Sequence, residues 1–290
     1  MNMVLAIIEQ AALFLPLMLG AYLSIALMKV PDLSLESAFT FGAILSAKCM
    51  PLVQGLPQVF GIPCVVLAAF VGGALVGCVS SFLTQKMGFA HLLSSIVTIG
   101  IFYGVNQIVL GTSNLSMSAY NNPLAFSYLG HFPELPTFLL ISALLFALLM
   151  ALLKTPLGYC FALYGENPYF FKNHKISTAF VFSACIIMSN GLVGIAGCFF
   201  AQANGFVDVT MGLGIPLLAI LGLLLGKFVL SKKRLAITVV GILFYFVIQQ
   251  FLLKLGFNLK FFPMIQGCLI LLILAIGPRS EQSKFNHLGV

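Results

Sequence analysis

The stretch 59-VFGIPCVVLAAFVGGALVGCVSSFL-83 contains no Asp, Glu, Lys or Arg. The hydrocarbon core of a bilayer is about 30 Å thick, and a helix of about 20 predominantly apolar residues crosses it. Val59–Leu83 is long enough to do so. The sequence therefore predicts a transmembrane helix here, and similar apolar runs lie on both sides of it.

The composition of the whole chain agrees with that interpretation. Of 290 residues, 61% are hydrophobic and 7% are charged, whereas a water-soluble domain has about 25% charged and about 45–50% apolar residues. The excess cannot be one soluble core, because the protein surface would then be apolar as well. We predict an all-α, polytopic transmembrane helical bundle of about 8–10 spans, forming a single domain over residues 1–290.

Nine apolar runs are candidate spans. The second is short and polar at its start, which allows a tilted, re-entrant or incomplete helix. Glycines recur at 72, 73 and 77 and at 191, 194 and 197, and small residues at such spacing let membrane helices approach closely. The runs are Val4–Met28, Leu33–Ala47, Val59–Leu83, Leu92–Leu110, Thr137–Leu153, Ala179–Ala201, Ile215–Leu230, Leu235–Leu253 and Phe261–Ile276.

The basic residues indicate how the spans are oriented. The net charge of +7 is scattered between apolar runs and forms no basic face interleaved with aromatics, so we predict no nucleic-acid partner. Alternating nine spans from an external N-terminus leaves only Lys48, Lys254 and Lys260 outside, out of fourteen Lys and Arg. Because cytoplasmic loops carry the excess of Lys and Arg, we expect the N-terminus outside and the C-terminus in the cytoplasm.

Chemistry-bearing motifs are missing from the sequence. The seven cysteines form no CxxC pair and are expected to be small buried hydrophobic residues rather than metal ligands. The four histidines are dispersed, and no nucleophile, base and acid constellation is present. No GxxxxGK[ST] phosphate loop occurs, so ATP cannot be bound by that route. We predict a protein that is not an enzyme, with no catalytic residues, no metal and no cofactor.

Three places depart from the apolar background, and the first is Pro31–Ser37. Asp32 or Ser34 can cap the following helix, and Glu36 lies in its first turn, where a carboxylate meets the positive end of the helix dipole. Capping alone explains this pattern. A gate or pathway role is the alternative, because carboxylates at membrane depth are expensive and often functional.

The second place is Tyr164–Lys175, within an internal connection of residues 155–178. Asn167 is a natural N-cap and Pro168 suits the first helical position. We predict a break at Gly165 and a short helix from about Pro168 to His174 across the cytoplasmic face. Tyr169, Phe170 and Phe171 would give this helix an aromatic face; an ordinary solvated loop is the alternative.

The third place is Ala201–Gly214, between two spans on the predicted outer side. Gly205, Gly212 and Gly214 allow turns with positive φ. Asp208 is expected outside or in a vestibule. A plain turn and an external mouth that receives substrate are both compatible with these residues.

In this order, these elements resemble the membrane subunits of bacterial ABC importers that use a substrate-binding protein. The resemblance is to the branched-chain amino-acid and ribose permease family, in particular to its tryptophan- and tyrosine-type branch, and covers about Leu15 to Pro278. It is carried by Asp32–Phe39 with Gly42-Ala43, Leu83–Lys86 with Leu92-Leu93, Gly111–Asn114, Gly165–Pro168, Ser189–Leu192, Ala201-Gln202 with Gly205–Asp208 and Met211–Gly214, and Asn258–Lys260.

The resemblance implies a permease subunit in the bacterial inner membrane that forms the translocation path for a small solute, an amino acid being expected. Its partners would be a second permease subunit, ATP-binding cassette ATPase subunits that hydrolyse ATP, an extracytoplasmic substrate-binding protein and the lipid bilayer. The implied ATPase-coupling residues are Tyr164, Gly165, Glu166, Asn167, Pro168, Tyr169, Phe170, Lys172 and Lys175. Candidates for the translocation path or gate are Asp32, Glu36, Asn106, Asn190, Gln202 and Asp208.

The main alternative is an ion-coupled secondary transporter that acts alone. Such proteins ordinarily carry buried ionisable residues in mid-span or broken helices around a site. Here Glu9 lies early in the first run and Glu36 at the start of the second, so we expect no mid-span charge. A membrane-bound enzyme, the remaining alternative, lacks a candidate constellation.

Overall fold

A computed structural model describes residues 3–118, 120, 122–125, 134–167, 169–173, 176–230, 235–257 and 261–276. The predicted helical bundle is confirmed, and each of the nine apolar runs contains a helix. The first element is α1 (Met3–Ala21), which continues as a π-helical turn, η1 (Tyr22–Leu27). The other helices are α2 (Leu35–Val53), α3 (Gln58–Gln85), α4 (His91–Leu110), α5 (Leu135–Leu153), α6 (Pro156–Glu166), α7 (Phe170–Asn173), α8 (Thr178–Asn204), α9 (Ile215–Val229), α10 (Ala236–Lys254) and α11 (Phe262–Ile276).

Six helical segments are long and apolar enough to cross a membrane by length and composition: α1 with η1, α3, α4, α5, α8 and α10. α9 and α11 are shorter apolar helices. The second run differs from its prediction, because its helix begins at Leu35 and extends to Val53 instead of ending near Ala47. The chain is a multi-pass membrane protein.

Two short strands add to the predicted all-α architecture. β1 (Asn114–Ser116) pairs antiparallel with β2 (Phe206–Asp208), with Asn114 opposite Asp208. This ribbon ties the connection after α4 to the turn after α8. Both connections were predicted to lie on the outer side, and the pairing places them on the same side of the bundle.

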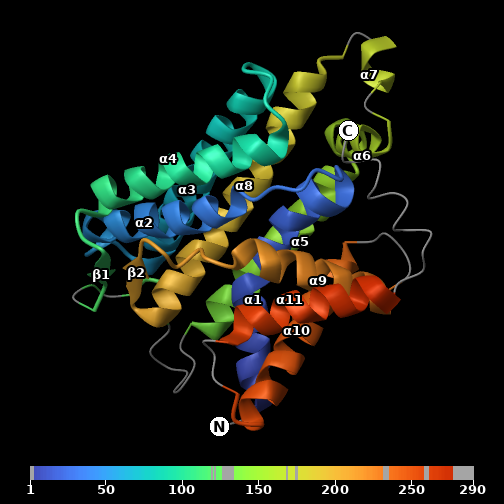
Figure 1. The fold of residues 1–290 in the computed structure, drawn as a ribbon. Helices are drawn as coiled ribbons and strands as arrows, with labels where there is room; N and C mark the ends of the chain where they lie inside the picture. Colours follow the sequence, from blue (N-terminus) through green and yellow to red (C-terminus); the bar gives the residue numbers. More distant parts are fainter. Residues whose placement is uncertain are drawn as a thin grey trace.

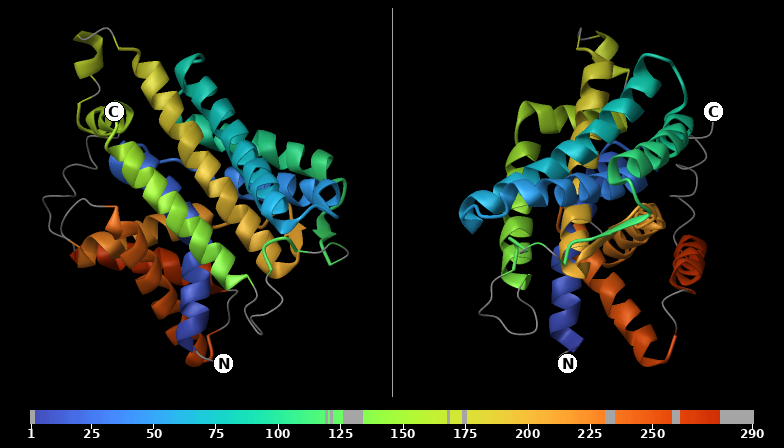
Figure 2. Two further views of the ribbon diagram at one scale, coloured as in Figure 1. Left: turned by 180° about the vertical axis from the view of Figure 1, so that it is seen from behind. Right: turned by 90° about the vertical axis from the view of Figure 1, so that its left-hand side faces the viewer.

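The structure separates two ends of the bundle. The first residues of α1 and the ribbon of β1 and β2 lie in the lower half of Figure 1, whereas α6 and α7 lie at the top right. The two further views agree: α5 runs upward to α6, and α8 runs downward from the end that carries α7 toward β2 (Figure 2). The internal connection of residues 155–178 and the ribbon are therefore at opposite ends.

The centre of the fold is a close contact of α8 with α3 and α2. A Cβ on Gly73 would overlap the carbonyl oxygen of Asn190, and one on Gly197 would overlap that of Phe39. A Cβ on Gly77 would lie 2.8 Å from the carbonyl oxygen of Ile186. The predicted close packing through glycines is confirmed: here backbone packs against backbone.

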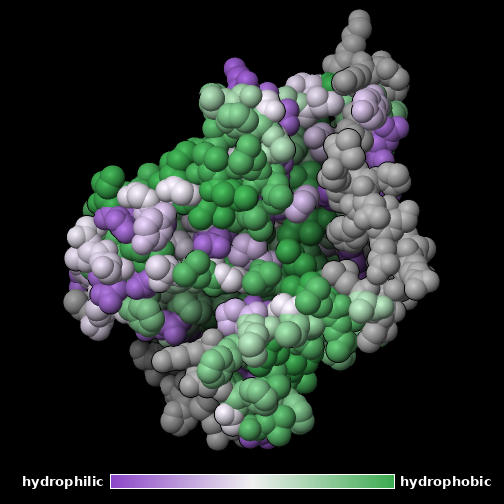
Figure 3. Space-filling model, in the orientation of Figure 1, coloured by the Kyte–Doolittle hydropathy of each residue, from purple (hydrophilic) through white to green (hydrophobic). Residues whose placement is uncertain are grey.

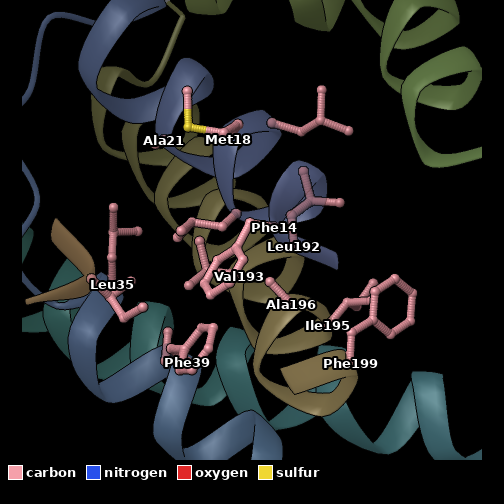
Figure 4. Packing of buried hydrophobic residues seen from close by; sticks show 14 of the residues in the cluster. Phe14, Met18, Ala21, Leu35, Phe39, Leu192, Val193, Ile195, Ala196 and Phe199 are labelled. Carbon is pink, nitrogen blue, oxygen red and sulfur yellow. The ribbon is translucent and has the colours of Figure 1, made fainter. Parts of the chain in front are cut away.

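Around this contact, large side chains from α1, α2 and α8 fill the interior. Phe14, Phe39, Val193 and Phe199 lie together in Figure 4, and Phe39 and Phe199 are fully buried. The ring centroids of Phe14 and Phe39 are 6.1 Å apart in a stacked arrangement. Outside, an apolar surface extends over α3 and α4, with polar residues toward the ribbon (Figure 3), as expected for helices that face lipid.

The glycine contact predicts a selective loss of stability. Gly197→Ala should lower the free energy of unfolding by about 1–3 kcal/mol, because the added methyl group forces α8 away from α2. Gly100→Ala is the matched control, since a Cβ at Gly100 on α4 meets no atom within 4 Å. The measurement is the thermal unfolding midpoint of the two variants in detergent, and an equal effect of both changes would contradict the packing argument.

Candidate functional site

The internal connection begins with a helix, α6, that packs against η1, the π-helical continuation of α1. Thr155 precedes α6 and its hydroxyl oxygen accepts a hydrogen bond from the Gly158 amide at 3.5 Å. The predicted break at Gly165 is wrong, because α6 continues through Gly165 to Glu166. A Cβ at Gly165 would overlap the carbonyl oxygen of Leu27. This glycine therefore serves the close approach of α6 to η1.

The break comes instead at Asn167, whose backbone is extended (φ −153°, ψ 90°). Its side-chain oxygen accepts a hydrogen bond from the Tyr169 amide at 3.1 Å, so the predicted capping chemistry of Asn167 is present. The helix that follows, α7, is shorter than the predicted helix and comprises only Phe170–Asn173. Pro168, His174 and Lys175 lie outside the described residues, as does the side chain of Lys172.

The aromatic residues of this segment point in two directions. Tyr169 is 69% exposed and Phe170 39% exposed, whereas Phe171 is fully buried. The prediction that all three form one outward face is therefore wrong for Phe171. Its ring lies 6.3 Å from that of Tyr164, centroid to centroid. Burial raises the pKa of the Tyr164 phenol, so this side chain stays neutral.

A buried polar cluster lies where the link from η1 reaches α2. Asp32 is 1% exposed, and its Oδ1 accepts the backbone amide of Ser34 at 2.9 Å and the Ser34 hydroxyl at 2.6 Å. Asn190 on α8 donates Nδ2 to Oδ2 at 2.9 Å. From α4, the Ser95 hydroxyl donates to Oδ1 at 3.3 Å, and His91 Nε2 lies 3.5 Å from the same oxygen.

This cluster can be compared with the predictions made for capping and for charged residues around Pro31–Ser37. Ser34 is the N-cap of α2 but makes no side-chain capping hydrogen bond to it, so capping does not account for Asp32 and Ser34. Asp32 does not contradict the expectation of no mid-span charge, because it lies in the link before α2, but its carboxylate is enclosed by donors from its own segment, α4 and α8. Buried charges require partners of this kind.

The polar cluster is connected to α7 through aromatic contacts. The ring of His91 lies 5.1 Å from that of Phe182 in an edge-on arrangement, and the Phe182 ring lies 5.9 Å from that of Tyr164. Tyr164 in turn contacts Phe171. On its other side, His91 Nδ1 lies 3.0 Å from the Thr84 hydroxyl of α3. A continuous series of side chains thus joins α7 to the start of α2.

Two of the remaining path candidates come together at a small hollow nearer the ribbon. Glu36 of α2 and Asn106 of α4 both line this space of about 50 Å³, with Tyr103 and the turn after β2. Gly212 in that turn does not have the predicted positive φ, unlike Gly205 and Gly214. It is needed for contact, since a Cβ there would overlap the carbonyl oxygen of Glu36. We call this space the outer hollow.

The last two path candidates lie elsewhere at this end. Gln202 of α8 is buried and donates Nε2 to the sulfur of Met50 at 3.3 Å. Asp208 of β2 accepts hydrogen bonds from the amide and hydroxyl of Thr210, which lines the outer hollow. The six candidates therefore form no single channel: Asp32 and Asn190 are in the buried cluster, and Glu36 and Asn106 line the outer hollow.

Sequence reasoning missed three members of the polar cluster. His91, Ser95 and Thr84 contact Asp32 or each other only because α3 and α4 pack beside α2. The sequence showed only that the histidines are dispersed, and His91 is the first residue of α4. Its side chain nevertheless turns inward to Asp32. No local pattern in the sequence indicates this, since the two residues are 59 positions apart, counting from 32 to 91.

Comparisons with known proteins identify a family and two relatives of this chain. Residues 3–274 match the model of a family described as the permease component of branched-chain amino acid transport systems. The tyrosine transport system permease protein of Clostridioides difficile is 29% identical over 285 residues, covering 96% of this chain and 92% of the relative. An uncharacterized protein of Rickettsia prowazekii is 26% identical over 289 residues, covering 97% and 100%. No solved structure matches the chain.

The polar cluster predicts a large effect of removing its carboxylate. Asp32→Ala should destabilise the chain by about 3–5 kcal/mol, because the backbone amide of Ser34 and one N–H of Asn190 then lose their buried acceptor. Asp208→Ala, which removes a less buried carboxylate with a local hydrogen-bond partner, should cost about 1 kcal/mol. Unfolding of both variants in detergent is the measurement; equal costs would show that the cluster is not structurally important.

Proposed function

This chain belongs to the family of permease components of branched-chain amino acid transport systems, and on that premise we propose that it is the membrane subunit of an ABC importer in the bacterial inner membrane. The observation that carries the proposal is the placement of α6 and α7. At the end opposite the ribbon of β1 and β2, α6 contacts η1 and α8, and α7 packs on α6. A segment outside the apolar helices, seated directly on them, is suited to pass on a movement made by another subunit.

An amino acid is the proposed solute. The family description names branched-chain amino acids, and the relative from C. difficile is named for tyrosine. The chain carries no phosphate-loop sequence, so in this proposal separate ATPase subunits hydrolyse ATP and the chain itself is not an enzyme. A second permease subunit and an extracytoplasmic binding protein complete the assembly.

The coupling surface is proposed to be centred on Glu166, Asn167, Tyr169 and Phe170. The exposed rings of Tyr169 and Phe170 fit an apolar groove of an ATPase subunit. Tyr164 and Gly165 support this surface from inside the protein: Tyr164 contacts Phe171, and Gly165 packs against η1. Pro168, Lys172 and Lys175 belong to the same surface by their place in the sequence.

Movement of α6 has two routes into the bundle. The first runs through η1, since Gly165 lies directly on the carbonyl of Leu27 and the chain passes from there to Asp32. The second runs through Phe171, Tyr164 and Phe182 to His91. Both end at the carboxylate of Asp32, which holds the start of α2 against α4 and α8. A shift of α6 would therefore tilt α2, and α2 also lines the outer hollow.

Ion-coupled transport by the chain alone remains the second candidate, and one observation favours it. Asp32 and His91 form a buried ionisable pair of the kind that proton-coupled transporters use. Against it, both oxygens of Asp32 are occupied by fixed donors, and Asp32 lines neither the outer hollow nor the hollow beside Pro57 and Asn122. Uptake that requires an active ATPase subunit supports the importer, and uptake driven by a proton gradient in its absence supports the alternative.

The proposed orientation has the ribbon outside the cell and α6 and α7 in the cytoplasm. A membrane-impermeant thiol reagent should then label Ser118→Cys in intact cells, whereas Asn167→Cys should react only after permeabilisation. The unmodified chain gives the background from its native cysteines. Labelling of Asn167→Cys in intact cells would reverse the proposed orientation.

The coupling proposal predicts a loss of transport without a loss of folding. Replacing Tyr169 and Phe170 together by Ala should reduce ATP-dependent amino-acid uptake by at least about tenfold, because aromatic side chains contribute much of the affinity of protein interfaces. Protein abundance and unfolding temperature should stay unchanged. Phe251→Ala, which removes a ring that is 59% exposed on α10, is the control. Normal uptake by the double variant would contradict the assignment of this surface.

A further inference from the structure

The carboxylate of Glu36 has no partner in the part of the chain that the structure describes. It lies in the first turn of α2, partly buried, at the outer hollow. The hydrogen bonds given for this residue involve its backbone: its amide donates to the carbonyl of Leu33 at 3.2 Å, and its carbonyl accepts from the hydroxyl of Thr40 at 3.1 Å. Asp32, in the link before α2, accepts hydrogen bonds from Ser34, Ser95 and Asn190. The two carboxylates therefore differ: Asp32 has several hydrogen-bond donors, and the Glu36 carboxylate has none among the described residues.

The helix dipole does not account for Glu36 on its own. A carboxylate in the first turn gains about 0.3–1 kcal/mol from the positive end of a helix at an exposed surface, and this gain needs neither a hollow nor a second polar group. Asn106 supplies that second group from α4. It is 2% exposed, its Oδ1 has no hydrogen-bond partner, and it lines the same hollow as Glu36.

An unsatisfied buried oxygen is costly, and buried polar groups in proteins nearly always have partners. Here two acceptor groups from different helices meet at one space. Apart from Glu36, no charged side chain lines the outer hollow. The ligand that satisfies such a site is a compact cation with several N–H donors, and a protonated amine has this chemistry.

Size agrees with that chemistry. The outer hollow measures about 50 Å³, and a water-sized group needs at least about 10–15 Å³ of such space. The space therefore holds an ammonium group with the atoms next to it, but not the side chain of a large amino acid. Tyr103 and Leu213 border the hollow and are 50% and 67% exposed, so an apolar side chain can lie against them outside it.

The hollow also has a fixed wall. Asp208 holds Thr210 through its amide and its hydroxyl, and Gly212 lies against the backbone of Glu36 without a side chain between them. The turn after β2 is therefore set on the start of α2. A preformed wall lowers the entropy cost of binding.

From these observations we propose that Glu36 and Asn106 form a subsite for the protonated amino group of the transported amino acid. The inference rests on the proposed function, because it takes an amino acid as the solute. It assigns the chain itself a share in substrate recognition: Glu36 provides the charge, and Asn106 provides the second acceptor across the hollow.

Direct binding to the full-length chain in lipid nanodiscs tests the subsite. The probes are L-tyrosine and L-leucine, their N-acetyl derivatives, which lack the ammonium group, and tyramine, which keeps it. We expect the two amino acids and tyramine to bind and the N-acetyl derivatives to bind at least about tenfold more weakly. Glu36→Gln should remove this difference and weaken binding of the amines by at least about tenfold.

Control variants keep the test decisive. Glu9→Gln makes the same change at another partly buried carboxylate, on α1 and outside the hollow, and should leave binding unchanged. Glu36→Asp keeps the charge and should retain the preference for amines even if Glu36→Gln fails to fold. Asn106→Leu should weaken binding of the amines, and the N-acetyl derivatives should still bind weakly.

Four results would overturn the subsite: equal affinities of the wild-type chain for amines and N-acetyl derivatives, wild-type affinities in Glu36→Gln, no binding of any amine, or saturation by Na⁺ that excludes tyramine.

Transport is scored separately, by ATP-dependent uptake in cells that express the whole transporter. Normal wild-type uptake with any of these four results would leave the proposed function standing and remove the subsite alone. Wild-type uptake that does not depend on the ATPase would instead remove the proposed function.

Discussion

The contact of α8 with α2 and α3 through bare backbone is the constraint on which the rest of the structure depends. Gly73, Gly194 and Gly197 leave no room for a side chain between these helices. Apolar burial adds little to helix association in lipid, so close packing and interhelical hydrogen bonds must hold the bundle together. Because the backbones approach so closely, α8 can place Asn190 beside the segment that begins α2.

That placement explains why a carboxylate can lie inside the bundle. Asp32 is surrounded by donors from its own segment, from α4 and from α8, so each helix loses a hydrogen bond if one of them moves independently. The cluster therefore fixes the start of α2 relative to two other helices. It also lies at the end of the aromatic contacts that begin at Phe171, so in the proposed importer it connects the coupling surface to the start of α2.

The two carboxylates of this region then have different tasks. Asp32 accepts hydrogen bonds from its own segment, α4 and α8, whereas in our proposal Glu36, in the first turn of α2, binds the amino group of the solute. Since both lie on the segment that carries the start of α2, a change in the position of α6 would reach the proposed amine subsite through a short rigid path. In the proposed importer, coupling and recognition thus lie on one short segment, from Asp32 in the link before α2 to Glu36 in its first turn.

The sequence by itself determined the membrane class, the nine helical runs and the glycines of the central contact, because hydropathy and small-residue spacing are local properties of the chain. It also marked the segment after Gly165 and the residues Asp32, Glu36 and Asn106 as departures from an apolar background. Only the tertiary structure decided that Gly165 is a packing residue, that Phe171 turns inward, and that His91 and Ser95 reach Asp32. It likewise showed that the Asp32 carboxylate has hydrogen-bond partners and that the Glu36 carboxylate has none among the described residues. These outcomes depend on which helices are neighbours, and contacts between residues far apart in the chain leave no mark on the local pattern of either one.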